Sequence, residues 1–457
     1  MMQRVFLLAA LVAVLLAGVP ARAGTGAKIE DAMLQPPAPA PRVLSGWAEA
    51  VSIVRERSTD LKAAYADLER ASGLSRTALA GLLPRVNGTG QLTHNVLNKY
   101  APGTPICDSL LGTCSNFVTD DALPRTYLDG AVTLVQPVID VKAWHELGTS
   151  KIAVEAAKLD LESRKRKIVL DLASAIVAII TAERIAELNR NGLRVALERV
   201  ALAEQRKVLG GGTRLDALRA RQDVDAARST VIAGDEALRQ AREALGLALG
   251  ISGEVGVTPD ISLDSLETST RASCKAASAV DDRSDVSAAR VRRDAAERRV
   301  TEAKQQFAPR LVGQSLLAFS SLSVEPNPVW NVQAVLSVPI WDGGARYGML
   351  RVAGADAARA EQELVATRRQ AEVEIARAQR AVSIASAQRQ VYADARAAAV
   401  ESDDLTQTAF HTGQGTSLEL VLAAAQRRQA EINVAVGDFD IVRARVADLI
   451  AHARCTF

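Results

Sequence analysis

Few residues of this sequence combine the types and the spacing that catalysis or metal binding requires. Its four histidines are far apart, and none has a second type of metal ligand at a useful spacing: His94, His145, His411 and His452. The segment Gly210-Gly211-Gly212-Thr213 is rich in glycine, but no lysine follows it as in a phosphate-binding loop. We therefore expect no catalytic residue, no metal and no cofactor, and we do not expect the chain to be an enzyme.

Two glycine-rich turns carry the most informative polar residues. Their glycines can adopt the positive φ that an abrupt reversal of the chain needs. An acidic residue follows at the same place in each turn, Asp216 and Glu419. The helix dipole favours a carboxylate in the first turn of a helix, which explains both as caps. Asp403 and Asp404 lie near the end of the long helix before the second turn and would add to the same negative field. The turn residues are Gly210, Gly212 and Thr213 in the first turn, and Gly413, Gly415 and Thr416 in the second.

Four cysteines allow three disulfide pairings in an oxidising compartment. Cys107 and Cys114 share one exposed loop, so we expect a local bridge between them. Cys274 lies between the two halves of the chain and Cys455 near its C-terminus. The sequence alone leaves this second pairing open, because it does not give the separation that a disulfide needs.

The elements around these residues are organised by a strand-to-helix segment, Val338-Pro339-Ile340-Trp341-Asp342-Gly343-Gly344-Ala345-Arg346. A shorter copy, Gln136-Pro137-Val138-Ile139-Asp140, occupies the same kind of place earlier. Pro137 and Pro339 are expected to end strand pairing, since proline has no N–H to donate. Asp342, Gly343 and Gly344 can turn the chain and cap the next helix. Two such transitions indicate an internal duplication.

Both halves show the same order of predicted elements, namely a helix, two strands, a long helix and a return helix. Asp60 is as far from Pro84 as Asp285 is from Pro309, so the register is kept. Each long helix would be about 100 Å long and needs parallel neighbours, as in a coiled coil. The predicted ranges are 45–83, 86–98, 127–136, 143–209 and 214–249 in the first half, and 284–307, 311–322, 329–338, 345–412 and 417–453 in the second.

The N-terminus has the pattern of a secretory signal peptide. Arg4 precedes an apolar run, and Ala21-Arg22-Ala23 is a small-residue cleavage site, so we expect cleavage after Ala23. The predicted domains are a signal peptide (1–23), a Pro-rich extended leader (24–45), a first repeat (46–250), an inter-repeat linker (251–282), and a second repeat with the C-terminal tail (283–457).

Composition narrows the class of protein further. The chain has 457 residues, a formal charge of +2 and an aromatic content of 4%, which gives no reason to expect nucleic-acid binding. The strands are long enough to cross an outer membrane, but four strands cannot close a barrel and open edges are not tolerated in lipid. Other copies of the chain must complete the sheet, while the polar helices stand in an aqueous compartment.

The sequence resembles the TolC family of outer-membrane efflux and secretion ducts over about residues 46–453. The similarity is carried by the order and spacing of several segments: the strand-to-helix segment at 338–344, Leu83-Pro84, Ala308-Pro309, Gly212-Thr213-Arg214-Leu215-Asp216 and Gly415-Thr416-Ser417-Leu418-Glu419. The resemblance implies a mainly α fold with long coiled-coil helices and a β-barrel, completed as a homotrimer with a twelve-stranded barrel and a periplasmic tunnel. It also implies a Gram-negative outer-membrane location and docking, through a periplasmic adaptor, to an inner-membrane pump of the RND or ABC type.

The resemblance also bears on individual residues. Family members often carry acidic rings where this chain has Val421 and Ala424, so their gate does not transfer directly. As an alternative to capping alone, Asp216 and Glu419 would attract cations and narrow the entrance of the tunnel that the resemblance implies, with Asp403 and Asp404 adding to the field. In the family the inter-repeat linker and the C-terminus share one belt, so Cys274 and Cys455 can meet. We expect one face of the last strand to meet lipid and the other to line the lumen. The lipid-facing residues would be Trp330, Val332, Ala334 and Leu336, and the lumen-facing residues Asn331, Gln333 and Ser337.

Two classes of function follow. The first is a passive outer-membrane exit duct for small toxic compounds or a type I secreted protein. The second is a soluble periplasmic coiled-coil scaffold or adaptor, for which paired strands of this length have no evident use. The sequence does not identify the substrate, the pump or the adaptor.

Overall fold

The structure is a computed structural model that describes residues 31–96, 106–108, 113–115, 126–259, 261–277, 279–321 and 328–455. The predicted signal peptide lies outside the described residues. The first repeat consists of α2 (Trp47–Arg57), α3 (Thr59–Ala80), β2 (Arg85–His94), β5 (Thr126–Ile139), α4 (Val141–Val208) and α5 (Arg214–Ala248). The second consists of α7 (Ser284–Gln305), β8 (Arg310–Ser320), β9 (Val329–Ser337), α8 (Ala345–His411) and α9 (Ser417–Ala451).

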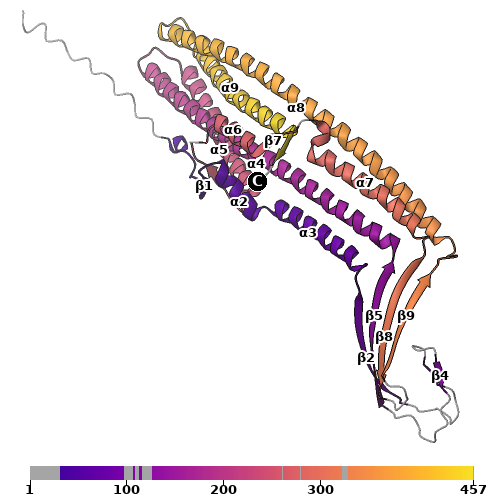
Figure 1. Cartoon of the computed structure of the whole chain (residues 1–457). Helices are drawn as coiled ribbons and strands as arrows, with labels where there is room; N and C mark the ends of the chain where they lie inside the picture. The colour runs from indigo at the N-terminus through magenta and orange to yellow at the C-terminus, as the bar shows by residue number, and fades with distance from the viewer. Residues whose placement is uncertain are drawn as a thin grey trace, which may run out of the picture. The chain divides into compact units, whose positions relative to one another are not determined.

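The predicted duplication is confirmed by this order of elements (Figure 1). In each repeat a helix leads into a strand, a second strand follows, and a long helix is joined to a return helix. The long helices α4 and α8 begin and end within two residues of their predicted bounds. The remaining elements are short: η1 (Ala32–Leu34), β1 (Arg42–Leu44), β3 (Ile106–Asp108), β4 (Thr113–Ser115), β6 (Val255–Val257), α6 (Leu263–Ser273), β7 (Cys274–Ala276), η2 (Val280–Asp282) and β10 (Ala453–Cys455).

The first predicted helix is divided at Ser58. The Ser58 side chain accepts a hydrogen bond from Leu61 N at 3.2 Å and so caps α3, while its own backbone leaves the helical region. A serine can accept a hydrogen bond from one of the unpaired N–H groups at a helix start, which offsets part of the free-energy cost of the break. Apolar periodicity continues across the break, so it did not reveal this cap.

Pro137 does not end strand β5, contrary to the sequence prediction. The strand continues to Ile139, and Pro137 lies opposite Val312 of β8, with an irregular step between Pro137 and Ile139. The pairing of β5 with β2 already ends at Val135. Beyond that residue, the edge of β5 that faced β2 makes no hydrogen bonds to another strand, so a proline there interrupts none. In the second repeat β9 ends at Ser337, before Pro339, as expected.

The segment between the repeats has secondary structure of its own. It contains helix α6 and the short strands β6 and β7. β6 pairs in parallel with β1, and β7 pairs antiparallel with β10 near the C-terminus. These pairings join residues far apart in sequence, so local composition described the segment only as a linker.

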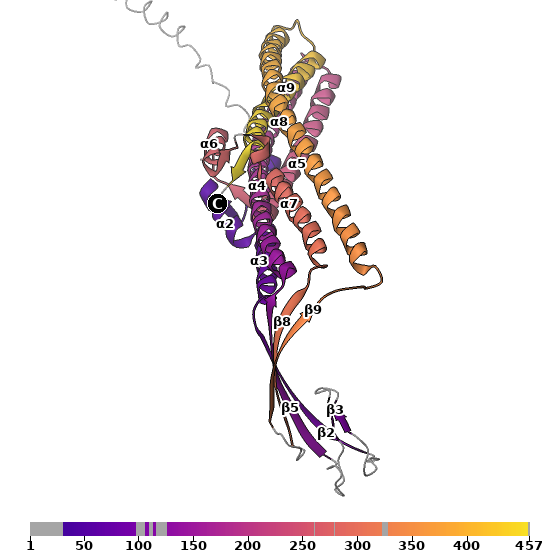
Figure 2. The ribbon, with the colours of Figure 1, turned by 45° about the vertical axis from the view of Figure 1, so that its right-hand side comes forward.

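Strands β2, β5, β8 and β9 form one antiparallel sheet in that order, with the twist visible in Figure 2. The register sorts the side chains into two faces, which we call the apolar face and the polar face. The apolar face holds Val86, Leu92, Leu128, Val132, Leu134, Leu317, Phe319, Trp330, Val332 and Leu336. The polar face holds Asn87, Thr89, Gln91, Asp129, Thr133, Gln314, Asn331, Gln333 and Ser337, together with the apolar residues Val312, Leu316 and Val335.

The chain forms two compact units. Unit 1 comprises Leu172–Leu266, Ala381–Ala444 and the described residues up to Ala50; unit 2 comprises Val51–Asp171, Glu267–Arg380 and the described residues from Arg445 onward. Within unit 1, α4 and α5 pack through a core of aliphatic and alanine side chains, namely Leu193, Ala196, Val224, Ala227 and Val231. Alanine in such a seam allows two long helices to approach closely.

The leader is bound to unit 1 rather than merely extended. Met33 and Leu34 pack against the core between α4 and α5. Asp31 forms an ion pair with Arg228 of α5 at 2.9 Å, and the carbonyl of Ala38 accepts a hydrogen bond from Arg242 at 2.9 Å. The leader thus follows α5 in the same direction before β1 pairs with β6.

Candidate functional site

The two glycine-rich turns, which we call the tip turns, have the same backbone design. Gly210 and Gly413 begin the turns with φ of 78° and 81°, a conformation that favours glycine. Gly212 and Gly415 act differently, because a Cβ at either would lie about 3.0–3.1 Å from the end of the preceding helix. One glycine of each turn therefore reverses the chain, and the other allows close approach.

Each tip turn ends in a reciprocal cap. Thr213 Oγ1 accepts from Asp216 N, while Asp216 Oδ2 accepts from Thr213 N at 3.0 Å and Oγ1 at 2.7 Å. In the second turn, Glu419 Oε2 accepts from Thr416 N at 2.8 Å and Oγ1 at 2.9 Å. These contacts support the capping explanation of both carboxylates. They also leave both groups at the exposed start of a helix, so the entrance hypothesis stays open.

The tip turns of the two repeats contact one another. Ser417 Oγ donates a short hydrogen bond to Asp216 Oδ1. Nearby, Arg206 lies over the ring of Phe410 at 4.3 Å and donates to the Phe410 carbonyl at 3.2 Å.

The same contacts shift the pKa values of the two carboxylates. The hydrogen bonds from Ser417 and Thr213 hold the pKa of Asp216 below its ordinary value of 3.8. The backbone N–H and hydroxyl of Thr416 lower the pKa of Glu419 in the same way.

Asp403 lies apart from the tip turns, in a buried network of charged side chains between helices of unit 1. Its side chain is only 3% exposed and pairs with Arg427 at 3.2 Å and with Arg199 at 3.8 Å. Arg199 also faces Asp223 of α5 at 3.5 Å. Asp404 is 64% exposed and also contacts Arg427. In the single chain the structure therefore groups Asp403 with helix-packing charges and does not bring it to Asp216 and Glu419.

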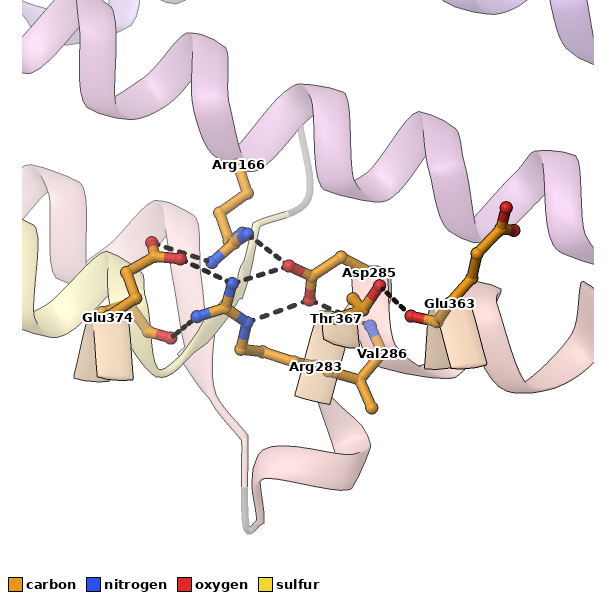
Figure 3. Close-up of polar contacts among 8 residues, drawn as sticks. Arg166, Arg283, Asp285, Val286, Glu363, Thr367 and Glu374 are labelled. Atoms are coloured by element: carbon orange, nitrogen blue, oxygen red, sulfur yellow. Dashed lines mark hydrogen bonds and ion pairs between the residues drawn. The ribbon is translucent and has the colours of Figure 1, made fainter. Parts of the chain in front are cut away.

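A second buried charge cluster lies in unit 2, where α4, α7, α8 and the end of α9 meet (Figure 3). Arg283 is 2% exposed and donates to Asp285 Oδ2 at 2.6 Å, Glu374 Oε2 at 2.8 Å and the Ala451 carbonyl at 3.2 Å. Arg166 donates to the same Asp285 oxygen at 3.0 Å. Burial by itself would raise the pKa of Asp285, but the two guanidinium groups outweigh it and lower the pKa.

This cluster was missed by the sequence reasoning. Asp285 marked the repeat register, but nothing local showed that Arg166 and Glu374 would reach it. Its members come from three helices and a helix end, so no spacing in the sequence signals the contact. The Ala451 carbonyl at the end of α9 gains a partner that the helix itself does not supply. We assign the cluster a role in holding the helices together.

Cys274 and Cys455 form a disulfide, with Cα atoms 4.0 Å apart. They lie opposite one another in the β7–β10 pair, which fixes the C-terminal strand to the segment between the repeats. Cys107 and Cys114 are likewise opposite in the β3–β4 pair. Their side chains lie outside the described residues, so the bridge between them stays a prediction.

The strand-to-helix segment of the second repeat is built around Asp342. Its carboxylate accepts from Gly344 N at 3.2 Å and Arg346 N at 3.1 Å, which caps the start of α8. Gly343 and Gly344 have φ of 68° and 90°. In the first repeat Asp140 accepts from Ala143 N at 2.9 Å, without glycines. Both transitions use an aspartate to start a long helix.

Within the described part of the chain, no three or more His, Cys, Asp or Glu side chains are grouped so that they could hold a metal ion. The helices described include none that is long and apolar enough to cross a membrane.

A duplicated chain with long helix pairs, capped tip turns and a two-faced four-stranded sheet has the fold of the outer-membrane channels. A family model described as outer membrane efflux protein matches residues 50–251 and 277–447, one segment in each repeat. The chain belongs to this family. No curated protein sequence matches it.

Solved channel structures share the fold at low sequence identity. The outer membrane protein VceC from Vibrio cholerae superposes with a TM-score of 0.71 at 18% identity, covering 88% of this chain and 95% of that chain. The CmeC outer membrane channel from Campylobacter jejuni gives 0.73 at 16% identity, covering 89% and 85%. The open-state MtrE outer membrane channel from Neisseria gonorrhoeae gives 0.70 at 17% identity, covering 88% of each chain.

Proposed function

We propose that this chain is the subunit of a homotrimeric outer-membrane exit duct, through which substrates pass passively after an inner-membrane pump releases them. The observation that carries the proposal is the sheet with one apolar and one polar face. On the apolar face Trp330 and Val332 are 73% and 72% exposed, so the described residues of one chain leave them largely uncovered. Contiguous exposed apolar surface of this kind marks a lipid or protein contact.

The edges of the sheet support assembly with other copies. β2 and β9 are the outer strands, and each has one neighbour among the described strands. An unpaired edge is not stable in lipid, because its N–H and C=O groups have no water to bind. Pairing β9 of one copy with β2 of the next satisfies both edges, and three copies would close a twelve-stranded barrel.

The tip turns are the proposed contact for a periplasmic adaptor, which would connect the duct to a pump of the RND or ABC type. They are exposed, capped and held to one another, so they present a defined surface of backbone and polar groups. The family model that matches both repeats is described as outer membrane efflux protein, which favours small toxic compounds as substrates over a type I secreted protein. We also propose the mature N-terminus after Ala23 and the predicted domain bounds.

The test is fractionation of cells that express the full chain, followed by electrophoresis with and without heating. We expect a heat-modifiable trimer in the outer-membrane fraction and channels when the trimer is added to a planar bilayer. Recovery of the chain in the soluble periplasm would instead support the scaffold or adaptor function and overturn the duct.

A further inference from the structure

Arg85 and Arg310 occupy equivalent places in the two repeats. Each directly follows the proline that ends a helix, Pro84 after α3 and Pro309 after α7. Each is also the first residue of the first strand of its repeat, β2 or β8. Because of the duplication, each chain has two such arginines, one per repeat, at the end of the sheet that is nearest the helices.

The register places both arginines on the polar face. Arg85 lies opposite Val135, in alternation with Asn87 and Thr89. Arg310 lies opposite Ser337, on the same side as Gln314 and its partner Gln333. Side chains alternate strictly between the faces of a strand, so neither arginine can share the face of Trp330 and Val332. Both are exposed in the single chain.

The charge on the four strands is unbalanced at this end. Among the described residues the other Asp, Glu, Lys or Arg of the sheet is Asp129, which lies at the far end and accepts from Ser320 Oγ at 2.5 Å. No described carboxylate lies within ion-pair distance of Arg85 or Arg310. Asp140, which follows β5, is used by the cap of α4. The two guanidinium groups therefore keep their donors for other partners.

On the basis of the proposed duct, we propose that Arg85 and Arg310 form a ring of guanidinium groups in its lumen that binds multivalent oxyanions and favours anionic substrates. Three copies would contribute six arginines in a nearly sixfold arrangement, because the two repeats present them equivalently. Rings of arginine select anions in other pores, and the planar guanidinium group matches phosphate and carboxylate oxygens. Such a ring would define a substrate class at the strand end of the duct, independently of the tip turns.

The test is block of the full-length trimer by inorganic tripolyphosphate in a phosphatidylcholine planar bilayer, with the anion added to each side in turn. We expect stronger block from one side than from the other. In an Arg85→Gln, Arg310→Gln double variant, half-block should need about tenfold more tripolyphosphate, since charge-assisted hydrogen bonds to the anion are lost. The reversal potential in a KCl gradient should also move toward cation preference, and less so at high salt.

Two controls keep the result interpretable. Arg85→Lys with Arg310→Lys retains the charge and should retain most of the block, and Arg271→Gln removes one exposed charge from α6 and should leave it unchanged. Equal block and equal reversal potential in the parent and the glutamine double variant would overturn the ring. So would an arginine-dependent change in trimer stability between phosphatidylcholine and phosphatidylglycerol with unchanged block, because the arginines would then bind lipid phosphates. A parent that forms neither trimers nor channels would refute the duct itself.

Discussion

Ser417 donates a hydrogen bond to Asp216, and this contact joins the tip turn of the second repeat to that of the first. Asp216 uses its other oxygen for Thr213, so one carboxylate both caps α5 and holds the neighbouring turn. The Asp216 side chain therefore caps the start of α5 and also holds the tip turn before α5 to the tip turn before α9.

The contact between the tip turns should respond to acid. The pKa of Asp216 is lowered in the folded chain, so the stabilisation is present above the ordinary value of 3.8 and is lost as the pH falls through the lower, folded value. We expect the single-channel conductance of the trimer to be constant from neutral pH to about pH 5 and to rise below pH 3.8. Ser417→Ala should raise conductance at neutral pH. Unchanged conductance in that variant would show that the contact does not restrain the entrance.

The tip carboxylates can be tested as caps and as an entrance field together. Asp216→Ala should cost about 1 kcal/mol, as for loss of a helix cap, and Glu419→Ala should also destabilise the start of its helix. If the carboxylates also attract cations, block by divalent or trivalent cations added on the tip side should weaken in the double variant. A double variant that is blocked as readily as the parent would leave only the capping role.

The two faces of the sheet predict opposite responses to a new charge. Val332→Arg should destabilise the trimer by roughly 2–4 kcal/mol if the residue lies near the bilayer midplane, whereas Gln333→Arg should be tolerated in a water-filled lumen. Resistance of the trimer to heat, measured by electrophoresis, compares the two neighbours. Tolerance at Val332 with damage at Gln333 would mean that the faces are reversed.

We expect the adjacent residues Asp403 and Asp404 to contribute different amounts to the free energy of unfolding. Asp403→Ala removes a buried partner of both Arg427 and Arg199, while Arg199 keeps Asp223, and should cost roughly 1.5–3 kcal/mol, as for the loss of a hydrogen bond to a charged group. Asp404→Ala removes a largely exposed partner of Arg427 and should change stability by less than about 1 kcal/mol. Thermal unfolding of both variants measures the difference. Similar small losses would show that water reaches Arg199.

The two disulfides can be identified by the cross-linked peptides in a proteolytic digest of the protein. Mass spectrometry without reduction should find Cys274 linked to Cys455 and Cys107 linked to Cys114. Cys455→Ser should lower stability by about 2–4 kcal/mol, because the bond closes a long loop. Free thiols in the parent would contradict the pairing, and an unchanged melting temperature would show that the β7–β10 pair holds the C-terminus without it.

The sequence by itself determined the features that depend on neighbours along the chain. The absence of proline from 143–209 and 345–412 indicated α4 and α8, because a proline would interrupt the backbone hydrogen bonds that a helix makes between residues four apart. Alternation defined β9 and its two faces, and glycine at Gly210 and Gly413 marked the reversals, because φ is set locally. The spacing of these signals revealed the duplication and the family resemblance.

Only the tertiary structure decided the features that depend on distant residues. β5 continues through Pro137 because β2 has already ended beside it, and the linker gains strands because β1 and β10 pair with them. Arg283 became the centre of a buried cluster because α4 and α8 bring Arg166 and Glu374 to it. A buried charge needs partners whatever their distance along the chain. Packing selects those partners, and no local pattern of residues encodes them.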